Sequence, residues 1–538
     1  MNGSRKLSLV VAAVLTFAPF GFSSATDVYI TPNGSPISGT PCTSNTQPPS
    51  WFNNSANWGA GTSKIGPGTT VHLCGTFTAS AGASGYLTFQ GGGSSGSPVS
   101  LRFESGAVLT APYWGSKGAI SAVGGLSYVV VDGGKNGTIQ ATLNGSPGAT
   151  CLGGACQYQQ NGFAVNMSPG SASCNNCEIK NLTISDMYMH TASSNDSGGN
   201  NGIGMNGNNI SIDNNSIHDT CWAINTGYAP AGTSNVSVFN NTLYNIDHGV
   251  AVGDTGNAAS LSGLYIYGNV IHDFSNWDTT GNYWHHDGIH VFANYTSSIS
   301  PPVMIYNNYI YGNWGANDNA GIYLEVYANS SNMGTHYVFN NIFAPSGGMC
   351  ANGAINDLVH GTGMNFYNNT MVGNGVGACG VLVGSQAATS SVIENSIYSG
   401  NGMSGQTAII DTTGGSTMST SDYNSWYKTY TGDAMRYNAW YTSVALWTSG
   451  TGFDRNSITS NPNLNSNYQP NSGSPVIGAG TNLYSTCNGQ PVPGLGALCN
   501  DYAGNPRPSS GNWDIGAYAY ATGDPPPAPP TGLAAVVR

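Results

Sequence analysis

The chain has 538 residues, of which 7% are charged, about a quarter of the share in an average soluble protein. A hydrophobic share of 39% excludes intrinsic disorder, and a total of only four glutamates excludes a long coiled coil. The net charge of −12, without any basic stripe, argues against a nucleic-acid partner. These numbers leave a large, polar, β-rich protein.

The first 25 residues have the pattern of a secretory signal peptide. Arg5 and Lys6 form a positive start, a mostly apolar run follows, and small residues precede the expected cleavage near Thr26. Pro19 interrupts a run that is already shorter than the roughly 20 residues a membrane span needs. We therefore expect a secreted, extracellular protein without a segment inserted in the membrane.

The eleven cysteines of an exported chain predict disulfide bonds. Spacing cannot fix connectivity, and the alternative for Cys174-x-x-Cys177, a zinc or redox pair, is weak because no second such pair occurs. The simplest arrangement leaves Cys221 over and pairs Cys42 with Cys74, Cys151 with Cys156, Cys174 with Cys177, Cys350 with Cys379 and Cys487 with Cys499.

A short pattern recurs through the middle of the chain. Each copy alternates apolar and polar residues, reaches an Asn-containing pair that can adopt a left-handed bend, and resumes with an apolar residue. The seven copies are 210–217, 236–243, 264–271, 303–310, 337–343, 364–371 and 392–397. A second strand, of the type Gly288-Ile-His-Val291, recurs between them.

Strands that return at such intervals predict an all-β fold, a single-stranded right-handed parallel β-helix in which each turn stacks on the one before. Stacked asparagines would satisfy one another in the bends. A β-propeller is the alternative, but its blades need about four strands each at more regular spacing.

The repeat also predicts how the chain is organised. Residues 26–125 are expected to form an N-terminal cap and the first turns, 126–420 the β-helix core, and 421–522 the last turns and a cap. Residues 523–538 begin with a proline-rich run and are expected to form an extended tail.

These repeats, the segment 125–136 and the closing Trp513-Asp-Ile-Gly-Ala-Tyr518 resemble the pectate-lyase-like superfamily of secreted right-handed β-helix proteins. The resemblance implies the fold over most of residues 26–520. It leaves the activity open, because the superfamily includes lyases, hydrolases, esterases and non-enzymatic adhesins.

Titratable side chains gather on one wall of the predicted helix, because residues at one position of successive turns become neighbours. Asp287 and Asp247 form the first candidate pair of catalytic carboxylates, with one protonating the leaving oxygen and the other activating water or attacking the sugar. The alternative partners are Asp318 and Glu325, and His248 and His290 are expected to tune these carboxylates or bind hydroxyls. The expected substrate-binding residues are Trp222, Asn225, Trp284, His286, Trp314 and Tyr323.

Two fragments of this wall resemble polygalacturonase motifs. His285-His286-Asp287-Gly288-Ile289-His290 is similar to their Asn-Thr-Asp-Gly-aromatic-Asp motif, and Asp247-His248-Gly249-Val250 is similar to their Gly-His-Gly motif. The resemblance is local and implies a catalytic carboxylate at Asp287 and a supporting role for His248.

The expected chemistry requires no cofactor. A calcium ion held by Asp247, Asp287 or Asp318 is compatible with the oxygen-rich surroundings. His286 and His290, four residues apart on an extended segment, would lie about 13 Å from each other and could not share one zinc ion.

The distribution of charge bears on the reaction. No lysine or arginine occurs between Lys180 and Lys428, whereas fifteen Asp or Glu residues do. An anionic polymer would be repelled there, so the sequence favours a glycoside hydrolase acting on a neutral or weakly charged polysaccharide. The alternatives are a calcium-dependent polysaccharide lyase with a histidine base and a non-enzymatic, adhesive β-helix.

Overall fold

The structure is a computed structural model of the whole chain. It describes residues 27–143, 156–157, 160–187, 200–227, 232–254, 260–274, 285–293, 298–315, 320–326, 332–347, 353–373, 381–383, 388–400, 410–412, 415–428 and 435–520. The predicted signal peptide and proline-rich tail lie outside these residues.

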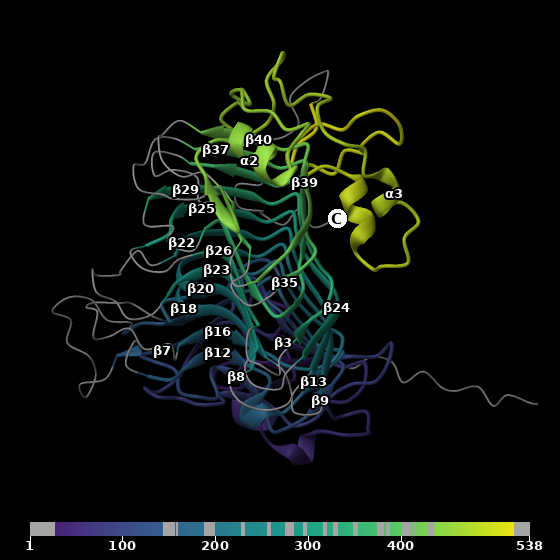
Figure 1. Ribbon diagram of the computed structural model, residues 1–538. Coiled ribbons are helices and arrows are strands. Elements are labelled where there is room, and N and C mark those ends of the chain that lie inside the picture. Colours follow the sequence, from purple (N-terminus) through teal and green to yellow (C-terminus); the bar gives the residue numbers. More distant parts are fainter. Residues whose placement is uncertain are drawn as a thin grey trace, which may run out of the picture.

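Almost all strands pair in parallel with strands of the neighbouring turns (Figure 1). One wall is a 17-stranded sheet. Its strands are β1 (Asp27–Ile30), β2 (Thr46–Gln47), β3 (Thr70–Leu73), β6 (Val99–Phe103), β10 (Val129–Asp132), β14 (Glu178–Lys180), β17 (Ile210–Asp213), β19 (Thr233–Phe239), β21 (Ser260–Tyr267), β24 (Ser298–Tyr306), β27 (Asn332–Met333), β28 (His336–Phe339), β31 (Gly361–Thr362), β32 (Met364–Tyr367), β35 (Ala388–Thr389), β36 (Ser391–Glu394) and β39 (Met418–Asp422).

A second network forms the remaining walls, because β18 and β20 bend from one wall into the next. Its strands are β4 (Thr76–Thr78), β7 (Val108–Ala111), β11 (Thr138–Ala141), β12 (Phe163–Asn166), β15 (Thr183–Ser185), β16 (Asn201–Gly204), β18 (Ser216–Gly227), β20 (Thr242–Asp254), β22 (Val270–Phe274), β23 (Asp287–Ala293), β25 (Tyr309–Asn313), β26 (Ala320–Val326), β29 (Ile342–Gly347), β30 (Ile355–Val359), β33 (Thr370–Val372), β34 (Val381–Val383), β37 (Ile397–Gly400), β38 (Ile410–Thr412), β40 (Ser425–Lys428), β41 (Met435–Tyr437) and β42 (Ala439–Tyr441). Two short pairs, β5 (Leu87–Phe89) with β8 (Ile120–Ala122) and β9 (Leu126–Ser127) with β13 (Cys174–Asn175), complete the strands.

The interior is filled by aliphatic side chains that repeat once per turn. Ile224, Val250, Ile289, Ile322 and Ile355 occupy one such row, and each is fully buried. Along each strand, side chains alternate between the interior and the outside, as expected for strands with one buried face. The protein is therefore a right-handed parallel β-helix, as the repeat predicts.

The repeated asparagine pairs form the corner between the 17-stranded sheet and the next wall. The first residue of a pair adopts a left-handed conformation, for example Asn240 at φ 55° and Asn307 at φ 53°. The second is buried, and its Oδ1 accepts hydrogen bonds of 2.9 to 3.1 Å from the backbone N and Nδ2 of the asparagine one turn before. This asparagine ladder, which confirms the predicted stacking, consists of Asn215, Asn241, Asn269, Asn308, Asn341 and Asn369.

In the described part of the chain, helices are few and short. They are α1 (Pro49–Phe52), α2 (Val444–Thr451) and α3 (Tyr484–Cys487), with 3-10 turns η1 (Ser55–Asn57), η3 (Pro169–Ser171) and η5 (Leu495–Cys499). The segment with α3 and η5 packs against the outer face of the 17-stranded sheet, where Leu498 and Trp513 cluster with Met304 and Phe339 (Figure 1). This segment covers aliphatic and aromatic side chains on the outer face of the sheet.

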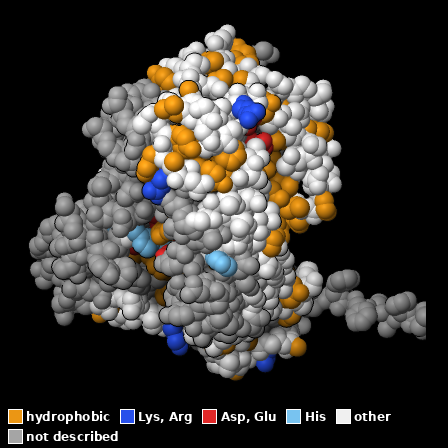
Figure 2. All heavy atoms as spheres, in the orientation of Figure 1, with side chains coloured by type: hydrophobic (Ala, Val, Ile, Leu, Met, Phe, Trp, Pro, Cys, Tyr) orange, Lys and Arg blue, Asp and Glu red, His pale blue; other side chains and the backbone are white. Residues whose placement is uncertain are grey.

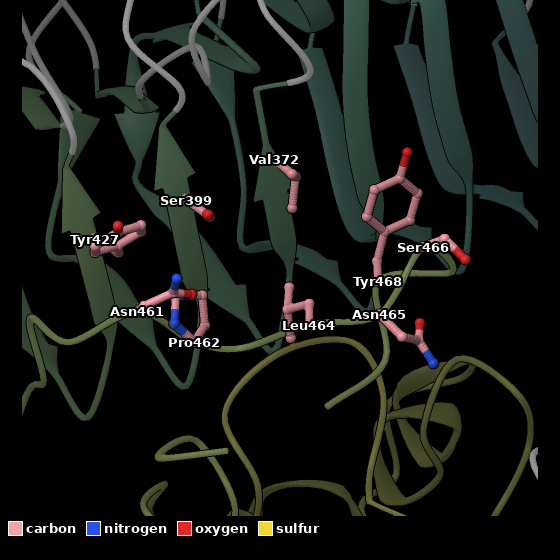
Figure 3. Close-up of a pocket in the computed structure, with 9 residues that line it drawn as sticks. All are labelled: Val372, Ser399, Tyr427, Asn461, Pro462, Leu464, Asn465, Ser466 and Tyr468. Carbon is pink, nitrogen blue, oxygen red and sulfur yellow. The ribbon is translucent and has the colours of Figure 1, made fainter. Parts of the chain in front are cut away.

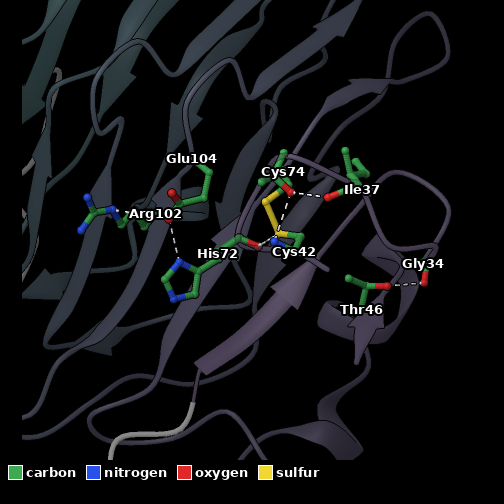
Figure 4. The surroundings of a disulfide bond; sticks show 9 residues. Gly34, Ile37, Cys42, Thr46, His72, Cys74, Arg102 and Glu104 are labelled. Carbon is green, nitrogen blue, oxygen red and sulfur yellow. Dashed lines mark hydrogen bonds and ion pairs between the residues drawn. A yellow bond between two sulfur atoms is a disulfide. The ribbon is translucent and has the colours of Figure 1, made fainter. Parts of the chain in front are cut away.

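Three of the expected disulfides are confirmed: Cys42–Cys74, Cys174–Cys177 and Cys487–Cys499. The first ties the loop before β2 to the end of β3, beside the His72–Glu104 pair (Figure 4). Cys156 is also disulfide-bonded, whereas the proposed Cys350–Cys379 pair lies outside the described residues. Within the described ranges, no helix is long and apolar enough to span a bilayer.

Candidate active site

Four neighbouring strands, β18, β20, β23 and β26, carry the candidate site on one wall. Their register places His248 opposite Asp287, His290 opposite Tyr323, and Phe292 opposite Glu325. The predicted convergence of these turns therefore occurs, and the side chains of three turns meet.

Glycines let the strands approach where they enter this wall. A Cβ on Gly288 would lie 2.6 Å from the carbonyl oxygen of Gly321, and one on Gly249 would collide with the carbonyl of Gly288. At Gly249 and Gly288 a larger residue would therefore have to displace the neighbouring strand. The close stacking brings the residues that flank the glycines, including His248 and Asp287, into contact across turns.

Four side chains point into one small space, and we call them the histidine cluster: His248, His285, Asp287 and His290. Nδ1 of His290 lies 3.2 Å from Nε2 of His248 and 3.4 Å from Nε2 of His285. Oδ2 of Asp287 lies 3.6, 3.5 and 3.8 Å from the nitrogens of His248, His285 and His290 respectively. All four facing atoms lie within 4.8 Å of one another.

Two carboxylates, of Asp247 and Glu325, contact the imidazole nitrogens that face away from the cluster. Asp247 Oδ2 lies 3.2 Å from Nδ1 of His248, and Glu325 Oε2 lies 3.0 Å from Nε2 of His290. Asp247 also binds Nδ1 of His286, and the buried thiol of Cys221 lies 3.4 Å from its Oδ2. Both oxygens of the Asp247 carboxylate are thus engaged by neighbouring side chains.

Asp287 is a buried carboxyl with an exposed fraction of 0%. Its Oδ1 accepts a hydrogen bond from the backbone N–H of Ala320 at 3.0 Å, which directs Oδ2 into the histidine cluster. Oδ2 has no hydrogen-bond partner among the described residues. A buried carboxyl oxygen without a donor costs free energy and points to a missing ligand or to a chemical role.

Burial sets the direction of the pKa shift for Asp287, His285 and His290, whereas the Asp247 carboxylate raises the pKa of His248 against the effect of burial. It raises the pKa of Asp287 to about 7, although His248 opposes the rise. It lowers the pKa of His285 to about 3 and that of His290 to about 4. Burial alone would raise the pKa of Asp247, but the imidazoles of His286 and His248 hold it below its usual range.

The candidate substrate-binding residues fall into different environments. Trp222 is half-buried beside the ring of His248, and the buried ring of Tyr323 stacks on His290 with centroids 5.0 Å apart. Asn225 is half-buried and donates to Asn201. Trp314 packs on Phe274 in the core and is fully buried, so it is not available to a sugar ring, contrary to expectation.

Two expected residues, Asp318 and Trp284, lie outside the described residues. One residue of the cluster, His285, was absent from the candidate set, whereas its neighbour His286 turns the other way, toward Asp247. Local pattern does not distinguish the two rings, because both residues precede β23, which begins at Asp287.

A separate pocket of about 490 Å³ lies farther along the helix (Figure 3). The described residues lining it carry no carboxylate, imidazole or cation: Val372, Ser399, Tyr427, Asn461, Pro462, Leu464, Asn465, Ser466 and Tyr468. It offers hydroxyls, amides and rings for contact but no group for acid–base chemistry. The histidine cluster is therefore the stronger candidate for an active site.

On the face of the molecule seen in Figure 2, Lys and Arg side chains are few, and a His side chain at the left lies beside acidic and hydrophobic ones. This agrees with the absence of Lys and Arg between Lys180 and Lys428.

No protein-family model and no curated protein matches the sequence. Among solved structures, XylC in complex with xylose is 10% identical with a TM-score of 0.50, and the match covers 92% of this chain and 98% of XylC. Pectate lyase Pel9A is 15% identical with a TM-score of 0.39, covering 93% of this chain and 98% of that one. A mannuronic acid-specific family 6 polysaccharide lyase from human gut microbiota is 11% identical with a TM-score of 0.39, covering 81% and 92%. At such identities the likeness concerns the fold alone.

Proposed function

We propose that the protein is a secreted carbohydrate-active enzyme that hydrolyses a neutral or weakly charged polysaccharide at the histidine cluster. The observation that carries the proposal is the convergence, over three turns, of buried imidazoles with Asp287 at the base and Glu325 at the rim. A regular β-helix does not require such a gathering of titratable groups on its wall.

The two carboxylates approach His290 from different sides. Asp287 Oδ2 lies 3.8 Å from Nδ1, and Glu325 Oε2 lies 3.0 Å from Nε2, so one imidazole ring lies between them. Glycoside hydrolysis uses two carboxyl groups roughly 5 to 9.5 Å apart, one as the acid and the other as base or nucleophile. An intervening ring is compatible with that range.

Exposure supports a division of roles. The Glu325 side chain is 17% exposed and the Asp287 side chain is 0% exposed, so Glu325 is the carboxylate within reach of a sugar oxygen. Asp247 acts as a positioning residue through His248 and His286.

The substrate class follows from charge. With no Lys or Arg between Lys180 and Lys428, this part of the chain offers no side-chain cation to hold a uronate carboxylate. Neutral sugars need only hydrogen bonds and aromatic faces, which Trp222 and its surroundings can supply. The binding of xylose by XylC, which shares the fold, supports testing xylose-containing polymers first.

The test compares wild type with Glu325→Gln on a panel of neutral and uronic polysaccharides, following reducing ends and the absorbance of unsaturated products separately. We expect reducing ends from a neutral polymer, without unsaturated products, and a loss of about 10²- to 10⁴-fold in Glu325→Gln. Glu394→Gln, the same change on the distant β36, is the matched control and should retain activity.

Three outcomes would overturn the proposal. Unsaturated products from a uronic polymer would identify a lyase. No release from any polymer by the folded protein would favour a non-enzymatic, adhesive β-helix. Full activity in Glu325→Gln would reject the assigned site.

A further inference from the structure

We propose that the histidine cluster is a transition-metal site, with Zn²⁺ as its preferred ion, bound by Nε2 of His248, Nε2 of His285, Nδ1 of His290 and Oδ2 of Asp287. The inference concerns metal binding by the same residues as the proposed hydrolysis, and its test measures binding without a substrate.

The spacing of the four atoms fits a tetrahedral ion. Five of the six separations are 3.2, 3.4, 3.5, 3.6 and 3.8 Å, and all lie within 4.8 Å. Tetrahedral zinc with bonds of about 2.0 to 2.1 Å separates its ligand atoms by roughly 3.3 Å. The side chains therefore need only small adjustments to hold one ion.

The outer contacts fix the tautomers that a metal requires. Nδ1 of His248 faces Asp247, and Nε2 of His290 faces Glu325, so a proton on each outer nitrogen is shared with a carboxylate. The opposite nitrogen of each ring then presents its lone pair to the cluster. Carboxylates that bind the far nitrogen of a ligating histidine are the usual partners of zinc sites.

The unsatisfied oxygen of Asp287 supports the metal site independently of the spacing of the four ligand atoms. This carboxyl is fully buried, Ala320 N–H orients it, and Oδ2 faces three imidazole nitrogens without any donor among the described residues. A bound ion would satisfy this oxygen, for which the described residues supply no hydrogen-bond donor.

The donor set selects the kind of ion. Three imidazole nitrogens and one carboxylate oxygen suit Zn²⁺ and its first-row neighbours, whereas Ca²⁺ takes six to eight oxygen ligands. Calcium at Asp247 or Asp287 is thus disfavoured, because Asp247 is engaged by histidines and Asp287 faces nitrogen.

The test measures binding directly, without a substrate. Untagged protein is stripped with a chelator and titrated with Zn²⁺ by calorimetry and with Co²⁺ by visible absorption, which is intense for a tetrahedral site. We expect one ion per chain. His285→Gln, at the most exposed ligand of the cluster, should weaken Zn²⁺ binding by about 100-fold or more, and Glu325→Gln by about 10-fold.

His218→Gln is the matched control, because His218 is paired with Asp219 outside the cluster, and it should bind Zn²⁺ as wild type does. Circular dichroism verifies that each variant is folded, and Asp287→Asn provides a second ligand variant. The proposed site would be wrong if the folded wild type did not bind Zn²⁺. It would also be wrong if His285→Gln and Asp287→Asn bound Zn²⁺ as tightly as wild type does. Zn²⁺ binding without hydrolysis would retain the site and reject only the proposed function.

Discussion

Asp213 is a buried carboxyl on the 17-stranded sheet, in register with Lys180 of the previous turn. Its Oδ2 accepts from Nδ2 of Asn214 at 2.6 Å, whereas Oδ1 has no donor among the described residues. Burial, and then the charge of Glu178, raises its pKa to about 6. The pKa of Asp213 in the folded state lies above the unfolded value of about 3.9. The contribution of this carboxyl to the free energy of unfolding is therefore fully present below about pH 4, and it is lost as pH rises through about 6.

We therefore expect Asp213→Asn to raise the free energy of unfolding by about 1 to 3 kcal/mol at pH 7.5, and by much less at about pH 4. Urea unfolding at the two pH values measures the difference. Asp27→Asn, whose parent side chain is 54% exposed, is the control and should show little change. Equal effects at both pH values, or a loss of stability at pH 7.5, would contradict the assignment.

The sequence predicts some contacts of the histidine cluster but not all of them. The sequence predicts that Asp247, His248, Asp287 and His290 approach one another, because stacking of turns follows from the repeat. It does not predict which ring of the His285–His286 pair enters the cluster, because the segment precedes β23 and its rotation depends on the contact between His286 and Asp247. Tertiary contacts, rather than local pattern, decide that rotation.

At the scale of the element, the close packing of β23 against β26 depends on Gly288, the second residue of β23. Gly288→Ala would place a Cβ 2.6 Å from the carbonyl oxygen of Gly321, so β23 must shift against β26. We expect a loss of about 1 to 3 kcal/mol in the free energy of unfolding, together with weaker Zn²⁺ binding, because Asp287 and His290 lie on the same strand. Chemical unfolding and zinc titration of the variant measure both effects.

Gly124→Ala is the matched control, because no atom lies within 4 Å of the Cβ it would add. It should leave both quantities close to wild type. Wild-type zinc affinity in a destabilised Gly288→Ala would show that the entry of β23 does not position the site.

The corners were the most predictable elements. The Asn-containing pair recurs at a fixed place in the pattern, and a buried amide occupies that place from Asn215 to Asn369, so spacing alone locates these corners. Trp314 was not predictable in the same way, because an aromatic residue after a strand can face the core or a cleft. Its packing on Phe274 is a tertiary contact that the repeat does not encode.

At the scale of the whole molecule, length alone would allow several domains, whereas the repeat correctly predicts one solenoid over most of the described chain. The uneven charge has a measurable consequence. Fifteen Asp or Glu residues without a Lys or Arg between Lys180 and Lys428 should repel anionic polymers at low salt.

We expect the affinity for a polyuronate to rise roughly two- to tenfold between about 0.01 and 0.1 M NaCl, since the Debye length falls from about 30 to about 10 Å. Binding of a neutral polymer should be unchanged. Affinity electrophoresis at the two salt concentrations measures both, and polyuronate binding that weakens with salt would indicate a cationic binding surface instead.

The asparagine ladder also shows how many residues each turn of the β-helix contains. Successive rungs are separated by 26, 28, 39, 33 and 28 residues, although each hydrogen bond between rungs has nearly the same length. The 39-residue turn carries Asp287 and His290, and the 33-residue turn carries Tyr323 and Glu325. Extra chain is thus accommodated where the titratable groups lie, without disturbing the vertical alignment of the turns above and below. A scaffold of this kind permits the surroundings of the site to be lengthened or exchanged while the register that assembles it stays constant.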